Sequence, residues 1–519
     1  MGATEHVDIP SFEQMGRLVA ATERIADVQE GKTSTLSTLE KELAETFIAG
    51  RTGKVFATKI YRNATNNTST GVRMKDSEGM TCEPSTDSVE GQDDFMSASP
   101  IFNYIRCNYT RDDDGTARPT ALEGSPAYKT TGAYDVGNVY PTFWWNWEHH
   151  ATYDMWYMSD APHPELGLVP WCEAVKADGT VLPFYAHSAF PAVTASDGLL
   201  RSQPNTYPAY NNSYNSIFTA FQKKGTGYLG AGSERNLFGM LIMIIKYATK
   251  NVQKKYAGCT NYNVQVKCAV AETGVKRVLV TSSDPWYVGG CVSVGVANGT
   301  NTDRGNSSMN SVCDRVRIKS IEKVTVSSTQ YTALNLDIDS TINTTTDTYV
   351  STMPCWAGET DAVIGHKDGS YLSNTDGHHS FRLLGTEFMW GQGFVESNTV
   401  SEKDENGDWL QYFAPKGTKH VQNAHTDYVL VGKISGSTSD YWSGDADVDK
   451  RGMMWPSTIG SSDSTGTGDR VWGPSSGSKG DLRERYTVGH LGYGSIAGLA
   501  TVGLGVDLGY SDWAYGCCD

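Results

Sequence analysis

The acidic triplet Asp445-x-Asp447-x-Asp449 has the spacing with which alternate carboxylates bind calcium in a loop. In an EF-hand, a glycine at the sixth position makes the sharp turn and a glutamate at the twelfth closes the site. Here Lys450 and Pro456 occupy those two positions. We therefore expect no EF-hand and no cofactor, and a looser calcium site in a surface loop is the alternative.

Two histidine pairs, His149-His150 and His378-His379, carry imidazole nitrogens that can bind a metal ion. Neighbouring residues in a strand point to opposite faces of the sheet, so the two rings of a pair would not meet at one ion. We expect no metal at either pair.

The stretch Gly225-Thr-Gly-Tyr-Leu-Gly230 fits the pattern Gly-x-Gly-x-x-Gly and precedes a predicted helix. Such a loop binds a dinucleotide when it joins a buried strand to a helix in a βαβ unit. Residues 218–224 do not have the pattern of a buried strand, and no βαβ repeat follows. We interpret the motif as a turn.

Catalytic signatures are scarce in this chain. It contains no His-Glu-x-x-His, no phosphate-binding P-loop and no Cys-x-x-Cys. Carboxylates are abundant, so a glycosidase pair stays open, but no pair is marked by its context. We expect a protein that is not an enzyme.

The chain of 519 residues is acidic, with a formal net charge of −16. Because phosphate binding needs clustered Lys and Arg, we expect no nucleic-acid partner, and we interpret the Lys-rich run 246–255 as the solvated face of a helix. The first residues lack the regions of a signal peptide, and the apolar stretch 237–245 is too short to cross a bilayer. We expect synthesis in the cytoplasm without a signal peptide, and no membrane insertion.

The C-terminal segment, about 486–519, interleaves two classes of position. The first class has the residue types of a scaffold: Gly489, Leu491, Gly494, Ser495, Ala497, Gly498, Leu499, Leu504, Leu508, Ser511, Trp513 and Gly516. The second class shares no chemistry: His490, Gly492, Tyr493, Ile496, Gly503, Gly505, Val506, Tyr510, Asp512 and Ala514. The segment's resemblance to the variable region of a known family of binding proteins implies that the second class forms one exposed ligand-binding surface, and that four scaffold residues lie beneath it in the core: Leu499, Leu504, Leu508 and Trp513.

This pattern resembles the variable region of the target proteins of diversity-generating retroelements, in which a reverse transcriptase rewrites adenines of a template copy. In that family the varying positions are Asn codons. An Asn codon in which only adenines change cannot encode Lys, Glu, Gln, Met or Trp, and none of the second-class residues is one of these five types.

A second resemblance lies in Phe381-Arg-Leu-Leu-Gly385-Thr-Glu387-Phe-Met-Trp390-Gly-Gln-Gly-Phe394. It is similar to the strand pair Gly-x-Glu-x-x-x-Gly-Asn-x-Trp-Glu-Trp of the C-type-lectin-like fold that formylglycine-generating enzymes share. The match is partial, because Gln392 stands where Asn is usual and Phe394 where Trp is usual. The resemblance to phage variable proteins of this fold covers residues 140–258 and 381–519.

The N-terminal part of the chain is predicted to differ from the rest. Residues 1–50 are predicted to be helical, because Ser11-x-x-Gln14 and Ser37-x-x-Glu40 are capping boxes followed by apolar residues at steps of three and four. Their apolar stripe suits trimerisation or attachment to a larger particle. Residues 51–135 are polar and turn-rich and predict a β-rich spacer with extended structure.

The remaining chain predicts an α+β fold. Residues 136–258 form the first part of a C-type-lectin-like domain, with a helix from Ser233 to about Tyr256, and residues 381–519 form the second part. Between them, alternating apolar residues predict a separate β-rich insertion, 259–380.

The resemblance implies a hypervariable receptor-binding or tropism protein of a phage or prophage. Its expected partner is a host cell-surface protein or glycan, and its expected assembly is a homotrimer attached through the N-terminus. Its place would be the tail tip or fibre of the virion, or else a bacterial cell surface. The alternatives are a glycan-active enzyme and a structural virion protein that carries a lectin-like domain.

Overall fold

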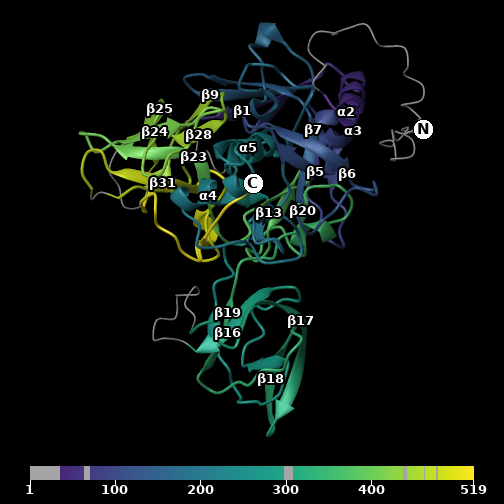
Figure 1. Cartoon of the computed structure of the whole chain (residues 1–519), viewed down its shortest axis with the longest axis vertical. Helices are drawn as coiled ribbons and strands as arrows, with labels where there is room; N and C mark the ends of the chain where they lie inside the picture. Colours follow the sequence, from purple (N-terminus) through teal and green to yellow (C-terminus); the bar gives the residue numbers. More distant parts are fainter. Residues whose placement is uncertain (1–35, 63–70, 297–307, 436–440, 461, 475–476) are drawn as a thin grey trace.

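The computed structural model describes residues 36–62, 71–296, 308–435, 441–460, 462–474 and 477–519. The fold is β-rich α+β, with several sheets around a few helices. Most elements form one body, and a smaller β lobe projects from it (Figure 1). Among the described residues, no helix combines the length and the apolar character needed to cross a membrane.

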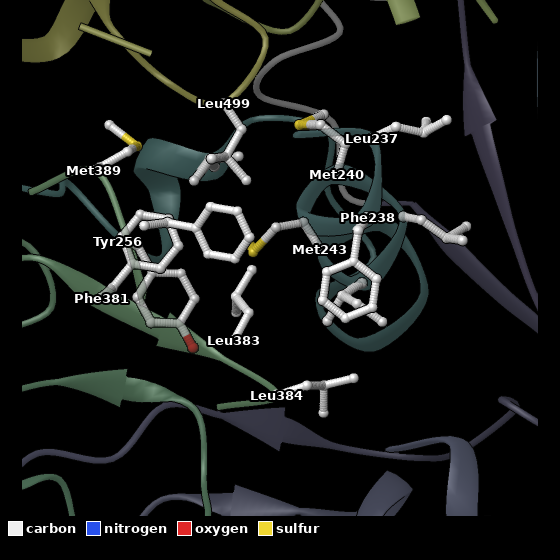
Figure 2. Packing of buried hydrophobic residues seen from close by; sticks show 14 of the residues in the cluster. Leu237, Phe238, Met240, Met243, Tyr256, Phe381, Leu383, Leu384, Met389 and Leu499 are labelled. Carbon is white, nitrogen blue, oxygen red and sulfur yellow. The ribbon is translucent and has the colours of Figure 1, made fainter. Parts of the chain in front are cut away.

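The helix α5 (Ser233–Tyr247) lies in the middle of the body (Figure 1). It is the core helix, because every side chain from Leu237 to Ile245 is buried. Figure 2 shows the side chains of α5 packed against those of Phe381 and Leu499, which come from distant parts of the chain. The predicted end near Tyr256 is wrong, because the left-handed backbone of Ala248 (φ 50°) stops the helix at Tyr247.

Lys246 contradicts the prediction of a solvated lysine face. Its side chain is fully buried, and its Nζ lies 2.6 Å from carboxylate oxygens of both Asp93 and Asp368. A buried ammonium group needs such partners, because burial of an unpaired charge is costly. The sequence pattern does not reveal the two aspartates, since both are distant from Lys246 along the chain.

Two antiparallel sheets of the body come from the first half of the chain. The first contains, in order, β10 (Val169–Pro170), β8 (Trp144–His149), β9 (Tyr153–Ser159), β1 (Val55–Tyr61) and β2 (Val72–Lys75). The second contains β11 (Phe184–Ser188), β7 (Asp135–Pro141), β5 (Ile105–Arg111) and β6 (Ala117–Leu122).

These sheets overturn the prediction of a spacer over 51–135. β1 pairs with β9 along its whole length, and the side chains of Phe56, Phe95 and Phe102 are fully buried against one another. The segment is polar and rich in turns because it crosses the surface between short buried strands. It therefore belongs to the body.

The N-terminal helix α2 (Thr38–Ala49) begins with the predicted capping box of Ser37 and Glu40. Leu36, Leu43 and Phe47 are buried against the sheet that contains β6, β7 and β11. This apolar stripe is therefore used within the chain and is not free for a coiled coil. The predicted box Ser11-x-x-Gln14 lies outside the described residues.

The projecting lobe is a six-stranded antiparallel sheet (Figure 1). In order, its strands are β14 (Gln265–Lys267), β19 (Thr348–Thr352), β16 (Cys291–Val296), β17 (Cys313–Val326), β18 (Thr329–Leu336) and β15 (Arg277–Val280). The lobe contains fewer residues than the predicted insertion 259–380, because its strands run only from Gln265 to Thr352. The chain from about 355 onward returns to the body, where Gly369 bridges to Ser85 and β20 (Gly369–Ser370) pairs with β21 (Phe381–Leu383).

A nine-stranded sheet forms the C-terminal part of the body. Its strands are β25 (Val429–Ile434), β24 (Trp409–Phe413), β23 (Gly393–Lys403), β31 (Leu482–Thr487), β32 (Val502–Gly503), β30 (Arg470–Trp472), β26 (Tyr441–Ser443), β29 (Ile459–Gly460) and β33 (Tyr515–Gly516).

Small elements complete the body. They are α3 (Asp94–Ala98), α4 (Tyr214–Phe221), β22 (Thr386–Phe388) beside β21, and the pairs β3 (Cys82–Glu83) with β4 (Gln92–Asp93), β12 (Ala192–Thr194) with β13 (Leu200–Ser202) and β27 (Ala446–Asp449) with β28 (Met453–Pro456).

Candidate functional site

The C-terminal segment is attached to the nine-stranded sheet at two short strands. β32 pairs with both β31 and β30, which places Val502 opposite Thr487 and Val471. β33 pairs in parallel with β23, which places Tyr515 opposite Gly393. The loops between these strands carry most of the candidate residues.

The strand pair that resembles the lectin-like motif lies directly beside this segment. The Gln392 amide donates to the Trp513 carbonyl oxygen at 3.0 Å, and its own oxygen accepts from the Trp390 indole at 2.9 Å. The Leu491 amide donates to the Gly391 carbonyl oxygen at 3.0 Å. Gln392, the departure from the motif, is thus one of the residues that bind the C-terminal segment.

The four scaffold residues predicted to lie in the core are buried, whereas Ser495 and Ser511 of the same class are exposed. Leu499, Leu504 and Leu508 are at most 2% exposed, and Trp513 is 9% exposed. Leu499 reaches the core helix, where an added Cβ on Gly239 would lie 2.7 Å from its Cδ1 (Figure 2). The prediction that these four residues lie in the core is confirmed.

The candidate ligand-binding residues divide into two groups. Eight are exposed or half-buried: His490, Gly492, Tyr493, Ile496, Gly505, Val506, Tyr510 and Asp512. Gly503 and Ala514 are buried, so the prediction that they face solvent is wrong. An added Cβ on Gly503 would lie 1.9 Å from the ring of Tyr486, because β32 pairs closely with β31. Ala514 lies against the start of β23, where its carbonyl oxygen accepts from the Gly393 amide.

Several candidate residues meet in what we call the aromatic patch, which comprises Trp472, Tyr486, His490, Tyr493, Tyr510 and Tyr515. Ring centroids lie 4.7 Å apart for Trp472 and Tyr493, and 4.0 Å apart for His490 and Tyr493. The ring centroids of Tyr486 and Tyr515 lie 5.0 Å apart, with the rings edge to face. The ring centroids of Tyr515 and Tyr510 lie 5.8 Å apart.

The edges of the patch are polar. The Tyr510 hydroxyl donates to Asp512 Oδ2 at 3.2 Å, and the Asp512 carbonyl oxygen accepts from the Asn211 amide at 2.9 Å. At the other edge, Gly492 lies against the side chain of Asn263, at the base of the lobe. The lobe therefore borders the candidate surface.

The patch can bind a ligand by ring stacking and by hydrogen bonds from phenol groups. Sequence reasoning missed its fixed members, Trp472, Tyr486 and Tyr515. Trp472 precedes the predicted C-terminal segment in the sequence, and Tyr486 stands at its first position. Both reach the patch because their strands pair with β32.

Two carboxylates of the acidic triplet are paired with arginines. The triplet lies in the hairpin of β27 and β28, and Asp445 and Asp449 each lie 2.6 Å from a guanidinium nitrogen, of Arg62 and Arg451 respectively. These arginines supply the positive charge that a calcium ion would bring.

One cluster with ligand atoms for a metal was not predicted. Cys82, Asp93 and Asp368 come together, with their ligand atoms within 4.8 Å of one another. The ammonium group of Lys246 contacts both carboxylates, so a cation of the protein already occupies the cluster. Burial raises the pKa of the Cys82 thiol, which disfavours the thiolate that binds metals.

The histidine pairs bind carboxylates of the protein. His149 Nδ1 lies 2.9 Å from Asp154, and His379 lies between Glu359 (3.1 Å) and Asp376 (3.4 Å). Burial lowers the pKa of His379, but hydrogen bonds to Asp376 and Glu359 outweigh burial and raise the pKa to about 10. His379 is therefore a buried cation at neutral pH.

The glycine motif forms a turn, as predicted, with the Tyr228 amide donating to the Gly225 carbonyl oxygen at 3.2 Å. At the start of α5, the Gly232 and Ser233 amides donate to Glu234 Oε1 and Asn398 Oδ1. Carboxylate and amide oxygens thus occupy the position where a phosphate would bind.

The adjacent Cys517 and Cys518 are free thiols, and both are fully buried. The extended backbone sends their side chains into two different clusters, Cys517 with Tyr486 and Leu508, and Cys518 with the α5 core. They act as small apolar side chains between two layers.

No protein-family model matches this chain, and no curated protein is significantly similar to it in sequence.

Proposed function

We propose that the chain is a hypervariable receptor-binding protein whose C-terminal surface is diversified by a retroelement. The observation that carries this proposal is the aromatic patch beside four buried scaffold residues, Leu499, Leu504, Leu508 and Trp513. A surface can change its side chains without unfolding when the residues beneath it pack in the core, as Leu499 and Leu504 do.

We also propose that the scaffold is C-type-lectin-like. The support is the contact of the Gly385-to-Phe394 motif with the C-terminal segment through Gln392 and Gly391. The partner would be a host cell-surface protein or glycan. Attachment to a phage virion, as a tail-tip or fibre protein, follows from the resemblance alone.

A homotrimer stays part of the proposal, but the apolar stripe of α2 no longer supports it. The stripe of α2 is covered by the chain's own sheet, so a trimer contact would have to use other surfaces. Light scattering of the purified chain tests this, because a monomer at every concentration would remove the trimer.

The DNA that surrounds the gene tests the proposed diversification. We expect a reverse-transcriptase gene and a template repeat of the 3′ end, with AAC or AAT at the candidate codons. Comparison of independent isolates should show substitutions at the eight exposed or half-buried positions. Substitutions spread evenly over the scaffold would contradict the proposal.

Binding is tested on cells of the bacterium that carries or hosts the gene. We expect the double variant Tyr493→Ser/Tyr510→Ser to lose cell binding, with an unchanged circular dichroism spectrum. The matched control is Tyr134→Ser, which removes an exposed tyrosine outside the patch. Normal binding by the double variant would overturn the assignment of the site.

A further inference from the structure

A cleft of about 100 Å³ lies beside the start of α5. This is several times the space that one buried water needs. Its walls come from the β5–β6 turn, the start of α5, the middle of β23 and the chain that follows β24. None of the candidate residues of the C-terminal segment lines it.

Two carboxylates of different character face the cleft. Glu173 Oε2 accepts from the Trp171 indole at 2.8 Å and from His187 Nδ1 at 2.9 Å, and its side chain is still 14% exposed. Glu234 accepts from the Asn398 amide at 2.7 Å, and no cation of the described residues forms an ion pair with it. Burial raises the pKa of Glu234, whereas the histidine and indole partners of Glu173 outweigh burial and lower its pKa.

Apart from Asp114, a third carboxylate in the lining, the other polar groups of the cleft are donors or neutral. Lys416 Nζ donates to the Glu173 carbonyl oxygen at 2.9 Å and has no ion-pair partner in the described chain. His420 is 6% exposed, and its Nδ1 has no hydrogen-bond partner among the described residues. Burial lowers the pKa of His420 to about 4, so the ring is neutral. A buried polar atom without a partner is a feature that a bound ligand can satisfy.

The charges and hydrogen-bonding groups that line the cleft indicate which class of ligand it can bind. The three carboxylates in the lining, Asp114, Glu173 and Glu234, are matched by three cations, Arg111, Lys416 and Arg451, so the cleft has no strong net charge to attract an ion. The first amides of α5 are already bonded, which disfavours a phosphate. Each hydroxyl of a sugar can both donate to a carboxylate and accept from an ammonium or amide group. The ring of Phe413 adds an apolar wall.

We propose that this cleft is a second site, outside the C-terminal segment, that binds one ring of a neutral saccharide, with Glu234, Lys416 and His420 as the contacting side chains. It is separate from the proposed variable surface and does not depend on it. It would give the protein a constant affinity for a surface glycan beside a changing affinity for a receptor.

Saturation-transfer NMR with methyl glycosides of glucose, galactose, mannose and N-acetylglucosamine tests the proposal on the full chain. We expect at least one of them to bind, and we expect Glu234→Gln and Lys416→Met each to weaken binding about tenfold, since each removes a charged hydrogen-bond partner. The His420 Nδ1 resonance should shift on binding.

The matched controls are Glu405→Gln and Lys479→Met, which break an exposed ion pair outside the cleft. Tyr510→Ser should also leave glycoside binding unchanged, so failure of the proposed receptor surface is distinguishable from failure of this site. Absence of binding by all four glycosides, or unchanged binding in both cleft variants, would overturn the proposal.

Discussion

Trp513 and Tyr510 are three residues apart, and their environments differ: Trp513 is 9% exposed and Tyr510 is 43% exposed. We expect Trp513→Ala to cost about 3–5 kcal/mol of unfolding free energy, because it leaves a cavity in the core. We expect Tyr510→Ser to cost within about 0.5 kcal/mol, as surface changes usually do. Urea denaturation of both variants measures the difference in unfolding free energy. Similar losses in the two variants would contradict the arrangement of a buried Trp513 beneath an exposed Tyr510.

Gly503 and Gly505 are a matched pair of glycines in the same segment. We expect Gly503→Ala to destabilise the fold by about 1–3 kcal/mol, because its Cβ would overlap the ring of Tyr486. Gly505→Ala should change stability by less than about 0.5 kcal/mol, since nothing lies within 4 Å of its added Cβ. Thermal melts compare the two, and equal melting temperatures would show that position 503 tolerates diversification.

At the scale of elements, α2 offers a test of whether its stripe serves the body or an assembly. We expect Leu43→Ala to cost about 2–5 kcal/mol, because Leu43 is buried against β6 and its neighbours. Ile48, on the opposite side, is 50% exposed, so Ile48→Ala should be nearly neutral. Denaturation and light scattering together are the measurement. If Ile48→Ala dissociated an oligomer, α2 would have an intermolecular role after all.

The segment 355–380 links the lobe to the body and contains the buried pair of His379 and Glu359. In the native state His379 keeps its proton up to a pKa of about 10, whereas an unfolded histidine releases it near 6.5. Between these values the native state binds more protons than the unfolded state, so stability falls as pH rises. We expect the melting temperature to decrease from about pH 6.5 to 10, and His379→Gln to flatten this decrease.

At the scale of the whole molecule, the lobe can be treated as an insertion. Its two ends meet at the base, where Val264 and Thr352 exchange hydrogen bonds of 2.9 Å. Replacement of residues 265–351 by a short Gly-Ser turn closes the chain without strain. We expect the remaining body to fold and keep receptor binding at reduced affinity, because the deletion begins two residues after Asn263, which lies against Gly492 at the edge of the patch. A truncated chain that does not fold would show that lobe and body are interdependent.

The sequence determined those features that depend on local order. The capping box of Ser37 and Glu40, the start of the helix near Ser233 and the β-rich character of the lobe all follow from spacing over a few residues. Each depends on neighbours within one turn of helix or one strand, which a sequence pattern records.

Only the tertiary structure decided which distant residues meet. Lys246 is buried because Asp93 and Asp368 neutralise its charge. Position 503 has no room for a side chain because strand pairing brings the ring of Tyr486 over Gly503. The spacer became part of the body because β1 pairs with β9 across a long stretch of chain. Such contacts depend on three-dimensional packing, and the free energy that fixes them is distributed over residues that no local pattern connects.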